Sequence, residues 1–128
     1  MTIKKIAIID DDDLILDLYV RKFSNRGYEV VAMSDRSLSL EKLLDFTPRV
    51  ILLDINMPTK NGLDVLQEIK NMFPSLPYVI LLTNNNEKFF ADKGKELGAS
   101  DYIVKVSKTP TEIADRVDSA LTKLSQVQ

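Results

Sequence analysis

Short apolar runs alternate along this chain with segments in which apolar residues recur at helical spacing. The apolar runs are Ile6–Ile9, Tyr28–Ala32, Val50–Leu53, Tyr78–Leu82 and Tyr102–Val104. Short runs that are rich in β-branched residues and closed by turn signals are typical of strands covered on both faces. In Val50–Leu53, four apolar residues lead directly into Asp54 and then towards Pro58. We therefore predict five strands and take this run as the one around which the chain is organised.

The segments between the runs predict helices. Leu14, Ile15, Leu18 and Tyr19 lie at helical spacings, and Gly27 is a typical signal for a helix end. Further apolar stripes predict helices that end near residues 46, 73, 97 and 124.

Helix starts are also visible in the sequence. Asp12 or Asp13 is the natural N-cap of the first helix. Before the last helix, Thr109 fits an N-cap, Pro110 fits the first helical position, and Glu112 completes a capping box.

Five alternations of strand and helix indicate a parallel sheet with helices on both faces and right-handed crossovers. The predicted fold class is α/β, a doubly wound five-stranded parallel sheet of order 2-1-3-4-5, flavodoxin-like (βα)5. With 128 residues the chain has the size of one ordinary domain, so we expect residues 1–128 to form a single domain.

Composition narrows the function. The chain has 17 Lys and Arg against 19 Asp and Glu, with no basic stripe, so we expect no direct contact with nucleic acid. It has no cysteine and no histidine, which excludes disulfides, thiolate zinc sites and imidazole acid–base catalysis. Any metal needs oxygen ligands, which suits Mg²⁺ or Ca²⁺. The first apolar run is too short for a signal peptide or membrane span, so we expect a cytoplasmic protein without a membrane partner.

Reactive side chains follow most of the predicted strands. They are Asp10 and Asp11 after the first, Asp54 after the third, Thr83 after the fourth and Lys105 after the fifth. Strands one and three are neighbours in the order 2-1-3-4-5, so the three carboxylates should share one crevice, where Mg²⁺ would relieve their repulsion. Taken alone, Asp54 also fits a turn cap. The whole set favours a phosphoryl site, with the carboxylate as nucleophile and the other groups stabilising charge.

These residues resemble one family, the receiver domains of two-component response regulators. The resemblance extends from Lys5 to about Leu124 and rests on Ile8-Ile9-Asp10-Asp11, on Leu53-Asp54-Ile55-Asn56-Met57-Pro58 with Gly62, on Leu82-Thr83, and on Gly98-Ala99-Ser100-Asp101-Tyr102-Ile103-Val104-Lys105. It implies that the chain is a signalling receiver and not an enzyme, apart from self-phosphorylation and self-dephosphorylation. The implied partners are a histidine kinase or phosphotransfer protein and a downstream effector protein or domain.

The resemblance also implies the roles of single residues. Asp54 matches the phosphoacceptor, Asp10 and Asp11 match the acidic pair at Mg²⁺, and Asn56 matches the position whose main-chain carbonyl completes the metal shell.

Three further positions carry implied roles. Thr83 and Lys105 match the pair that contacts the phosphoryl oxygens, and Tyr102 matches the aromatic switch residue. We expect the signal to alter the face formed by the fourth helix (about Glu87 to Leu97), strand five and the last helix. That face would bind the partner or a second copy of the chain, giving a possible homodimer.

One position departs from the family pattern. The family usually has Lys-Pro with a cis peptide bond after the fifth strand, whereas this chain has Lys105-Val106. A cis bond before a residue other than proline costs about 3–4 kcal/mol, so the loop is either remodelled or strained.

Two other functions stay open at this stage. Asp10-Asp11-Asp12 contains the Asp-x-Asp of haloacid dehalogenase-like phosphohydrolases, in which Asp10 would be the nucleophile. Asp13 stands where that motif has Thr or Val, and no late acidic pair follows. The other alternative is a receiver-like module that binds partners without taking phosphate, an interpretation that Val106 leaves open.

Overall fold

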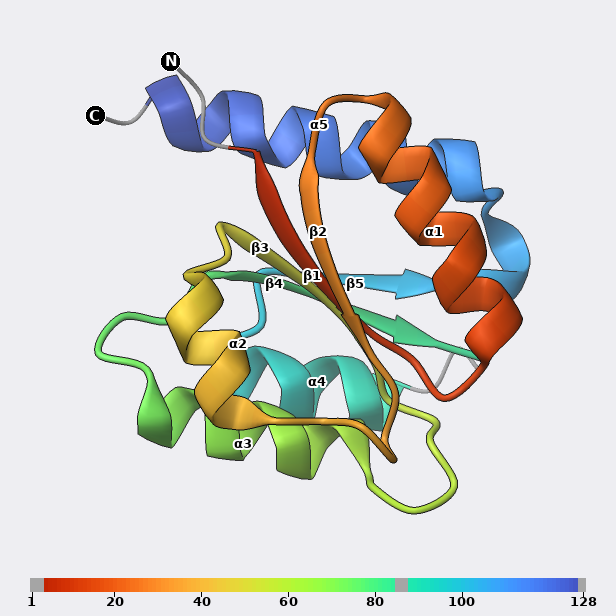
Figure 1. The fold of residues 1–128 in the computed structure, drawn as a ribbon. Helices are drawn as coiled ribbons and strands as arrows, with labels where there is room; N and C mark the ends of the chain where they lie inside the picture. Colours follow the sequence, from red (N-terminus) through yellow and green to blue (C-terminus); the bar gives the residue numbers. More distant parts are fainter. Residues whose placement is uncertain (1–3, 85–87, 127–128) are drawn as a thin grey trace.

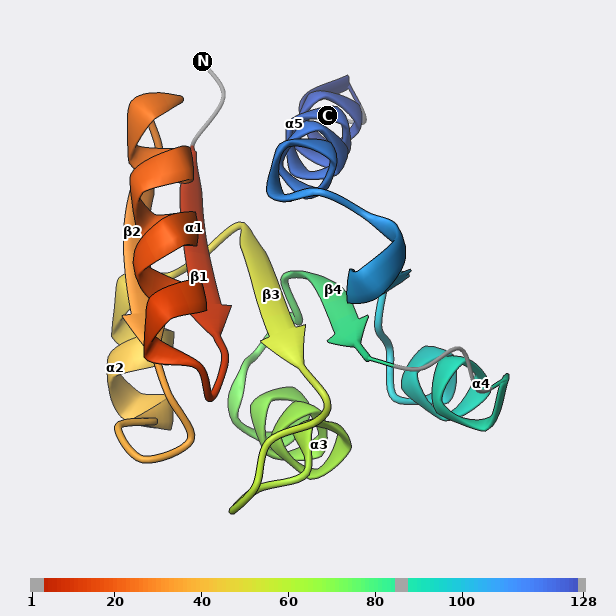
Figure 2. The same ribbon diagram turned by 90° about the vertical axis from the view of Figure 1, so that its right-hand side faces the viewer.

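The computed structural model describes residues 4–84 and 88–126. Its centre is a five-stranded parallel sheet of order β2-β1-β3-β4-β5 (Figure 1). The strands are β1 (Lys5–Ile9), β2 (Glu29–Met33), β3 (Val50–Asp54), β4 (Tyr78–Thr83) and β5 (Asp101–Val104). The arrows of β1, β3 and β4 point the same way in Figure 2, so their carboxyl ends share one edge of the sheet. The predicted fold class and strand order are confirmed.

Helices cover both faces of this sheet. They are α1 (Asp13–Asn25), α2 (Leu40–Phe46), α3 (Gly62–Met72), α4 (Lys88–Glu96) and α5 (Pro110–Gln126). α1 and α5 lie on one face, and α2, α3 and α4 lie on the other (Figure 1). Glu87, where we expected the fourth helix to begin, lies outside the described residues. Across the described residues, no helix combines the length and the apolar character that a membrane span requires.

Each face of the sheet has its own apolar cluster. Ile8 and Leu52 belong to the cluster under α1 and α5, whereas Ile9 and Leu53 belong to the cluster under α2, α3 and α4. Alternate side chains of a strand point to opposite faces, so a strand covered on both sides is apolar at every position. Each such side chain contributes roughly 1.5–3 kcal/mol when it is fully buried. This packing fixes the carboxyl ends of β1 and β3 in space.

The buried face of α1 differs from the predicted stripe. Its buried residues are Leu16, Tyr19 and Phe23, while Leu14 and Leu18 are 81% and 43% exposed. Spacings of three and four residues place Leu16, Tyr19 and Phe23 on one side of the helix. The sequence has more apolar residues on α1 than the sheet and α5 can cover.

Both predicted helix starts are present. Asp12 is the N-cap of α1, and its side chain accepts hydrogen bonds from the N–H groups of Leu14 and Ile15. At α5, the Glu112 N–H donates to the Thr109 hydroxyl, and the Thr109 N–H donates to the Glu112 carboxylate. This reciprocal pair is the predicted capping box.

The loop after β5 is remodelled. Lys105–Ser107 form a single 3-10 turn, and the described residues contain no cis peptide bond. The Lys105–Val106 bond is therefore trans, and Val106 is 80% exposed beside the carboxyl edge of the sheet.

Gly62, the first residue of α3, should not tolerate a side chain. A methyl group there would overlap the Asp54 carbonyl oxygen and lie 2.5 Å from the Ile55 Cα. Because both are backbone atoms at the end of β3, Gly62→Ala should lower the free energy of unfolding by about 2–3 kcal/mol in urea denaturation. Gly94→Ala is the control, because its methyl would meet a flexible Leu81 side chain. Equal losses in the two variants would contradict this explanation.

Candidate functional site

Two buried carboxylates lie side by side at the carboxyl edge of the sheet. Asp54 ends β3 and Asp10 directly follows β1, and these two strands are neighbours. Ile8 and Leu52 belong to the apolar cluster under α1 and α5. Because side chains alternate along a strand, Asp10 and Asp54, two residues later, point to that same face of the sheet. Both acids are 1% exposed. Their position therefore follows from the packing of the two strands.

A third carboxylate and one ammonium complete the cluster. Carboxylate oxygens of Asp10, Asp11 and Asp54 lie within 4.8 Å of one another. The Lys105 Nζ donates to Asp10 Oδ2 at 2.7 Å and lies 3.4 Å from Asp54 Oδ2. The predicted convergence of Asp10, Asp11, Asp54 and Lys105 is therefore observed, although Val106 replaces proline in the loop that carries Lys105.

Main-chain N–H groups hold the two buried acids. The Asp12 N–H donates to Asp10 Oδ1 at 3.0 Å, and the Asn56 N–H donates to Asp54 Oδ1 at 3.0 Å. Each carboxylate thus has one oxygen turned to its own loop and the other turned to Lys105.

The charges in this cluster are unbalanced. Burial raises the pKa of Asp54 to about 7, with Lys105 opposing the rise and Asp10 adding to it. Burial alone would lower the pKa of Lys105, but the hydrogen bond to Asp10 and the charge of Asp54 outweigh it and raise that pKa. Lys105 therefore stays protonated at neutral pH, while the three carboxylates hold more negative charge than it can offset.

This donor set fits a hard divalent cation. The carboxylate oxygens of the three residues lie close enough together to share one ion, and hard cations such as Mg²⁺ take oxygen ligands while keeping several waters. An open hollow of about 330 Å³ adjoins the cluster and leaves room for a bound ion and a phosphoryl group. Its lining consists of Asp10, Asp11, Asp12, Ile15, Asp54, Asn56, Asn84, Lys105 and Val106.

The Thr83 hydroxyl has a partner that the sequence did not predict. Thr83 Oγ1 donates to the Asn56 side-chain oxygen at 3.1 Å, and the Asn84 N–H donates to that same oxygen at 2.8 Å. Thr83 follows Leu81 on the face of the sheet opposite Asp54, so its side chain approaches the site from the other side. The Asn56 side chain therefore ties the loop after β3 to the loop after β4. From the sequence, only the main-chain carbonyl of Asn56 was expected to have a role.

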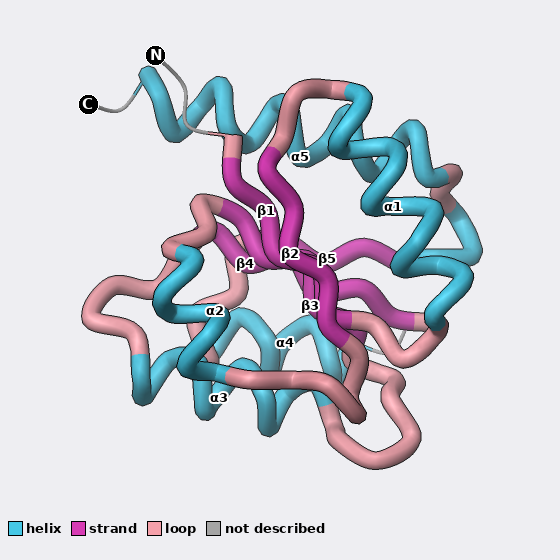
Figure 3. The backbone as a smooth tube through the Cα atoms, viewed as in Figure 1, coloured by secondary structure: helices cyan, strands magenta, loops and turns pink. Residues whose placement is uncertain are grey.

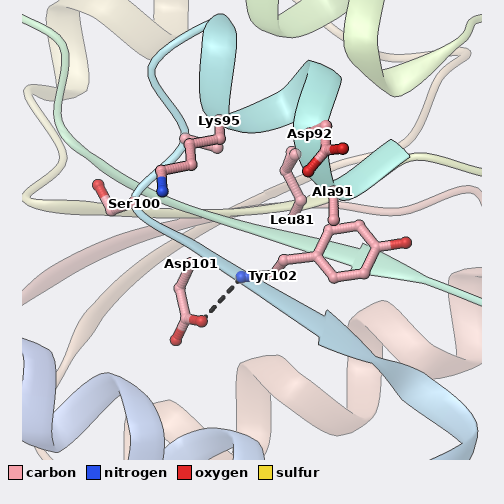
Figure 4. Close-up of a pocket in the computed structure, with 8 residues that line it drawn as sticks. Leu81, Ala91, Asp92, Lys95, Ser100, Asp101 and Tyr102 are labelled. Atoms are coloured by element: carbon pink, nitrogen blue, oxygen red, sulfur yellow. Dashed lines mark hydrogen bonds between the residues drawn. The ribbon is translucent and has the colours of Figure 1, made fainter. Parts of the chain in front are cut away.

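Tyr102 lies in β5 opposite Leu81, two residues before Thr83 in the neighbouring strand. It is partly buried and packs against the apolar cluster under α2, α3 and α4. In Figure 4 its ring lies beside Ala91 of α4, whereas Asp101 points away from that helix. Asp101 pairs instead with Arg116 of α5 at 2.9 Å.

A hollow of about 310 Å³ lies between α4 and β5 (Figure 4). Its lining consists of Leu81, Ala91, Asp92, Lys95, Ala99, Ser100, Asp101 and Tyr102. Its lining includes Tyr102, so a movement of that ring would change its shape.

The raised pKa of Asp54 gives a test by pH. Without metal, a carboxyl with a folded-state pKa near 7 binds its proton more tightly than in the unfolded chain, where 3.8 is usual. Protonation of Asp54 therefore contributes fully to the free energy of unfolding at low pH. This contribution is lost between pH 3.8 and about 7, and the free energy of unfolding falls by up to about 1.4 kcal/mol per pH unit. In EDTA, Asp54→Asn should therefore gain stability over the parent chain as the pH rises through this window. Urea denaturation at several pH values measures this, and a constant difference would contradict it.

Comparisons with known proteins agree with this geometry. The family model of the response regulator receiver domain matches residues 6–118. The alkaline phosphatase synthesis transcriptional regulatory protein PhoP of Bacillus subtilis is 33% identical over 123 residues, which is 94% of this chain. The chain spans 49% of that curated relative.

Solved structures give the same result. A CheY-like receiver domain protein from Methanospirillum hungatei aligns with a TM-score of 0.85 at 25% identity, over 98% of this chain and 99% of that one. The beryllofluoride-activated N-terminal receiver domain of RstA from Klebsiella pneumoniae aligns with a TM-score of 0.79 at 25% identity, over 92% and 98%. With its fold, its acidic edge and these relatives, the chain belongs to the receiver domains of two-component response regulators.

Proposed function

We propose that Asp54 of this chain accepts a phosphoryl group from a histidine kinase or phosphotransfer protein, with Mg²⁺ bound beside it. The observation that carries the proposal is the cluster of three carboxylates, two of them buried, reached by the Lys105 ammonium. We further propose that residues 1–128 act as one receiver domain, located in the cytoplasm. These 128 residues contain no histidine, so a phosphohistidine donor must lie outside them.

The transfer step has a simple balance. A carboxylate oxygen of Asp54 forms the new bond to phosphorus, while the bond from phosphorus to the donor nitrogen breaks and its electron pair leaves with the imidazole. With an acyl phosphate donor, the leaving atom is an oxygen instead. The carboxylates of Asp10, Asp11 and Asp54 and the Asn56 main-chain carbonyl would hold Mg²⁺, which would supply positive charge beside the phosphoryl oxygens.

The protein side chains stabilise the phosphorylated state. Lys105 already lies 3.4 Å from Asp54, so its ammonium can contact a phosphoryl oxygen without a large movement. The Thr83 hydroxyl can contact another oxygen once it leaves Asn56. The phosphoryl group stays on the chain until it is hydrolysed, which makes this a signalling role and not turnover of a substrate.

The geometry favours Asp54 over Asp10 as nucleophile. Asp10 is the closer partner of Lys105, at 2.7 Å against 3.4 Å for Asp54, so its carboxylate is the more firmly held of the two. This geometry therefore disfavours a phosphohydrolase with Asp10 as nucleophile. A module that cannot take phosphate is also disfavoured, because Lys105 reaches the cluster despite Val106.

We propose that the signal leaves through Thr83 and Tyr102. A hydroxyl drawn to the phosphoryl group would free space next to Tyr102, so the ring could turn inward and reshape the hollow between α4 and β5. Such coupling biases two existing arrangements, and is worth about 1–3 kcal/mol in comparable systems. The face of α4, β5 and α5 would then bind the effector or form a homodimer. The relative PhoP is a transcriptional regulatory protein of which this chain spans 49%, so the remaining part of PhoP would be the place for such an effector.

Phosphorylation should occur on Asp54 and require Mg²⁺. Treatment with an acyl phosphate and Mg²⁺ should add one labile phosphoryl group, measured by intact mass. Asp54 should accept it because, of the two buried carboxylates, it is the one farther from the Lys105 ammonium. The adduct should be absent in Asp54→Asn and after addition of EDTA. An equal adduct in Asp54→Asn would refute the assignment.

A variant of the metal site serves as the control for the fold. Asp11→Ala should lose the adduct while unfolding as cooperatively as the parent, because removing one of three crowded carboxylates relieves repulsion. Loss of cooperative unfolding would show instead that the cluster has a structural role.

Thr83→Ala should separate phosphorylation from the response. The variant keeps Asp54 and Lys105, so it should still bind beryllofluoride with Mg²⁺, but the coupling to Tyr102 should be lost. In the parent chain, beryllofluoride should shift backbone amide signals at Phe90, Tyr102 and Ile113, and in Thr83→Ala these shifts should be reduced. Shifts confined to the loops after β1 and β3 in the parent chain would contradict this route.

A further inference from the structure

The loop between β2 and α2 is buried where it leaves the sheet. Ser34 and Asp35 are 4% and 5% exposed, although they follow the edge strand β2. Loops normally lie at the surface because buried polar groups need partners. Figure 3 shows that the loops after β1, β2 and β3 gather at the same end of the sheet. The contacts of this buried loop reach both of its neighbours.

Asp35 contacts the loop after β3. Its Oδ2 accepts a hydrogen bond from the Thr59 hydroxyl at 2.6 Å and a longer one from the Thr59 N–H at 3.4 Å. The bond from the Thr59 hydroxyl holds the pKa of Asp35 below its usual value, so Asp35 is a carboxylate at neutral pH. Thr59 lies three residues after Asn56, which the proposed function places at the metal.

Arg36 contacts the loop after β1. Its Nη2 donates to both carboxylate oxygens of Asp13 at 3.0 Å, and its Nη1 donates to the main-chain oxygen of Asp11 at 3.5 Å. The Nη1 atom also lies 3.5 Å from Asp35 Oδ1. Asp35 and Arg36 therefore join the loop after β1 to the loop after β3 through one short segment.

We propose that Asp35 and Arg36 form a brace that fixes the loop of Asp11 relative to the loop of Asn56, and that both are positioning residues for the metal site. The inference rests on the proposed function, because it concerns the binding of Mg²⁺ by Asp10, Asp11 and Asp54. The brace acts on loops and main-chain groups and leaves the carboxylates of the site free to bind the ion.

The energetics of the cluster explain why a brace is useful. In the absence of metal, Asp54 at the end of β3 repels the carboxylates of Asp10 and Asp11, which tends to move the loop after β1 away from β3. If the loops are already held at the distance that suits the ion, less free energy is spent on ordering them when the ion binds. Asp35 Oδ1 is also a buried oxygen with no hydrogen bond within the described part of the chain. A buried acceptor of this kind calls for an explanation, and Asp35 holds Thr59, three residues after Asn56.

The sharpest test uses two substitutions at Thr59, an exposed residue. Thr59→Val removes the hydroxyl at nearly constant shape, and Thr59→Ser retains it. Mg²⁺ is titrated into each chain while backbone amide signals are followed by NMR. Thr59→Val should raise the Kd for Mg²⁺ by about tenfold, the lower end of the losses seen when groups around metal ligands are removed, and Thr59→Ser should restore the parent value.

A second pair tests the other half of the brace. Arg36→Gln removes the contacts to Asp13 and Asp11, whereas Arg21→Gln removes an exposed ion pair with Asp17 on α1 that lies away from the site. Exposed ion pairs contribute little to stability, so both variants should unfold as the parent does. Only Arg36→Gln should weaken Mg²⁺ binding.

The outcomes separate the brace from the metal site itself. Equal Mg²⁺ affinity in Thr59→Val, Arg36→Gln and their controls would overturn the brace. If the parent chain binds no Mg²⁺, the proposed metal site is wrong and the brace is judged from metal-free spectra. There, Thr59→Val must shift or broaden the amide signal of Asp11, on the other loop, and a spectrum identical to that of Thr59→Ser would reject the proposal.

Discussion

Electrostatic repulsion among three carboxylates at the edge of a parallel sheet is the constraint on which the functional part of this structure depends. Asp10 and Asp54 are buried by the packing of β1 and β3, and Asp11 lies next to them. In solution such groups would separate or take up protons. Here two apolar clusters hold the strands in place, so the repulsion has to be met by neighbouring groups.

Lys105 supplies part of the compensation from a distant point in the sequence. It is 95 residues from Asp10 and 51 from Asp54, and it reaches both only because β5 pairs with β4 and the chain then makes a 3-10 turn. One ammonium does not balance three carboxylates, and burial, with the charge of Asp10 adding to it, raises the pKa of Asp54. The remaining negative charge is the reason for proposing that a cation binds here, beside a phosphoryl group that Lys105 would contact.

Two kinds of contact join the loops around the carboxylate cluster. Asp35 and Arg36 join the loops after β1 and β3 through several hydrogen bonds to a partly buried segment. Thr83 and Asn56 join the loops after β3 and β4 through a single side-chain oxygen. A contact of the second kind is easily exchanged for one to a phosphoryl oxygen, which suits a switch, whereas the first kind suits a fixed frame.

The sequence by itself determined the fold and the chemistry of the site. Fully apolar runs require strands covered on both faces, and the alternation of strands and helices then permits few topologies. Because parallel strands end at one edge, Asp10, Asp54 and Lys105 could be placed together from their positions after the runs.

Tertiary structure decided what depends on contacts between loops. Leu14 and Leu18 fit a helix, but their exposure was set by how much of α1 the sheet and α5 cover. The partner of Thr83 and the link from Asp35 to Thr59 were equally hidden, because residues 24 to 27 positions apart meet only after the strands pack. A local pattern records which residues form an element, whereas the pairing of polar groups across loops is fixed by the geometry of the assembled sheet.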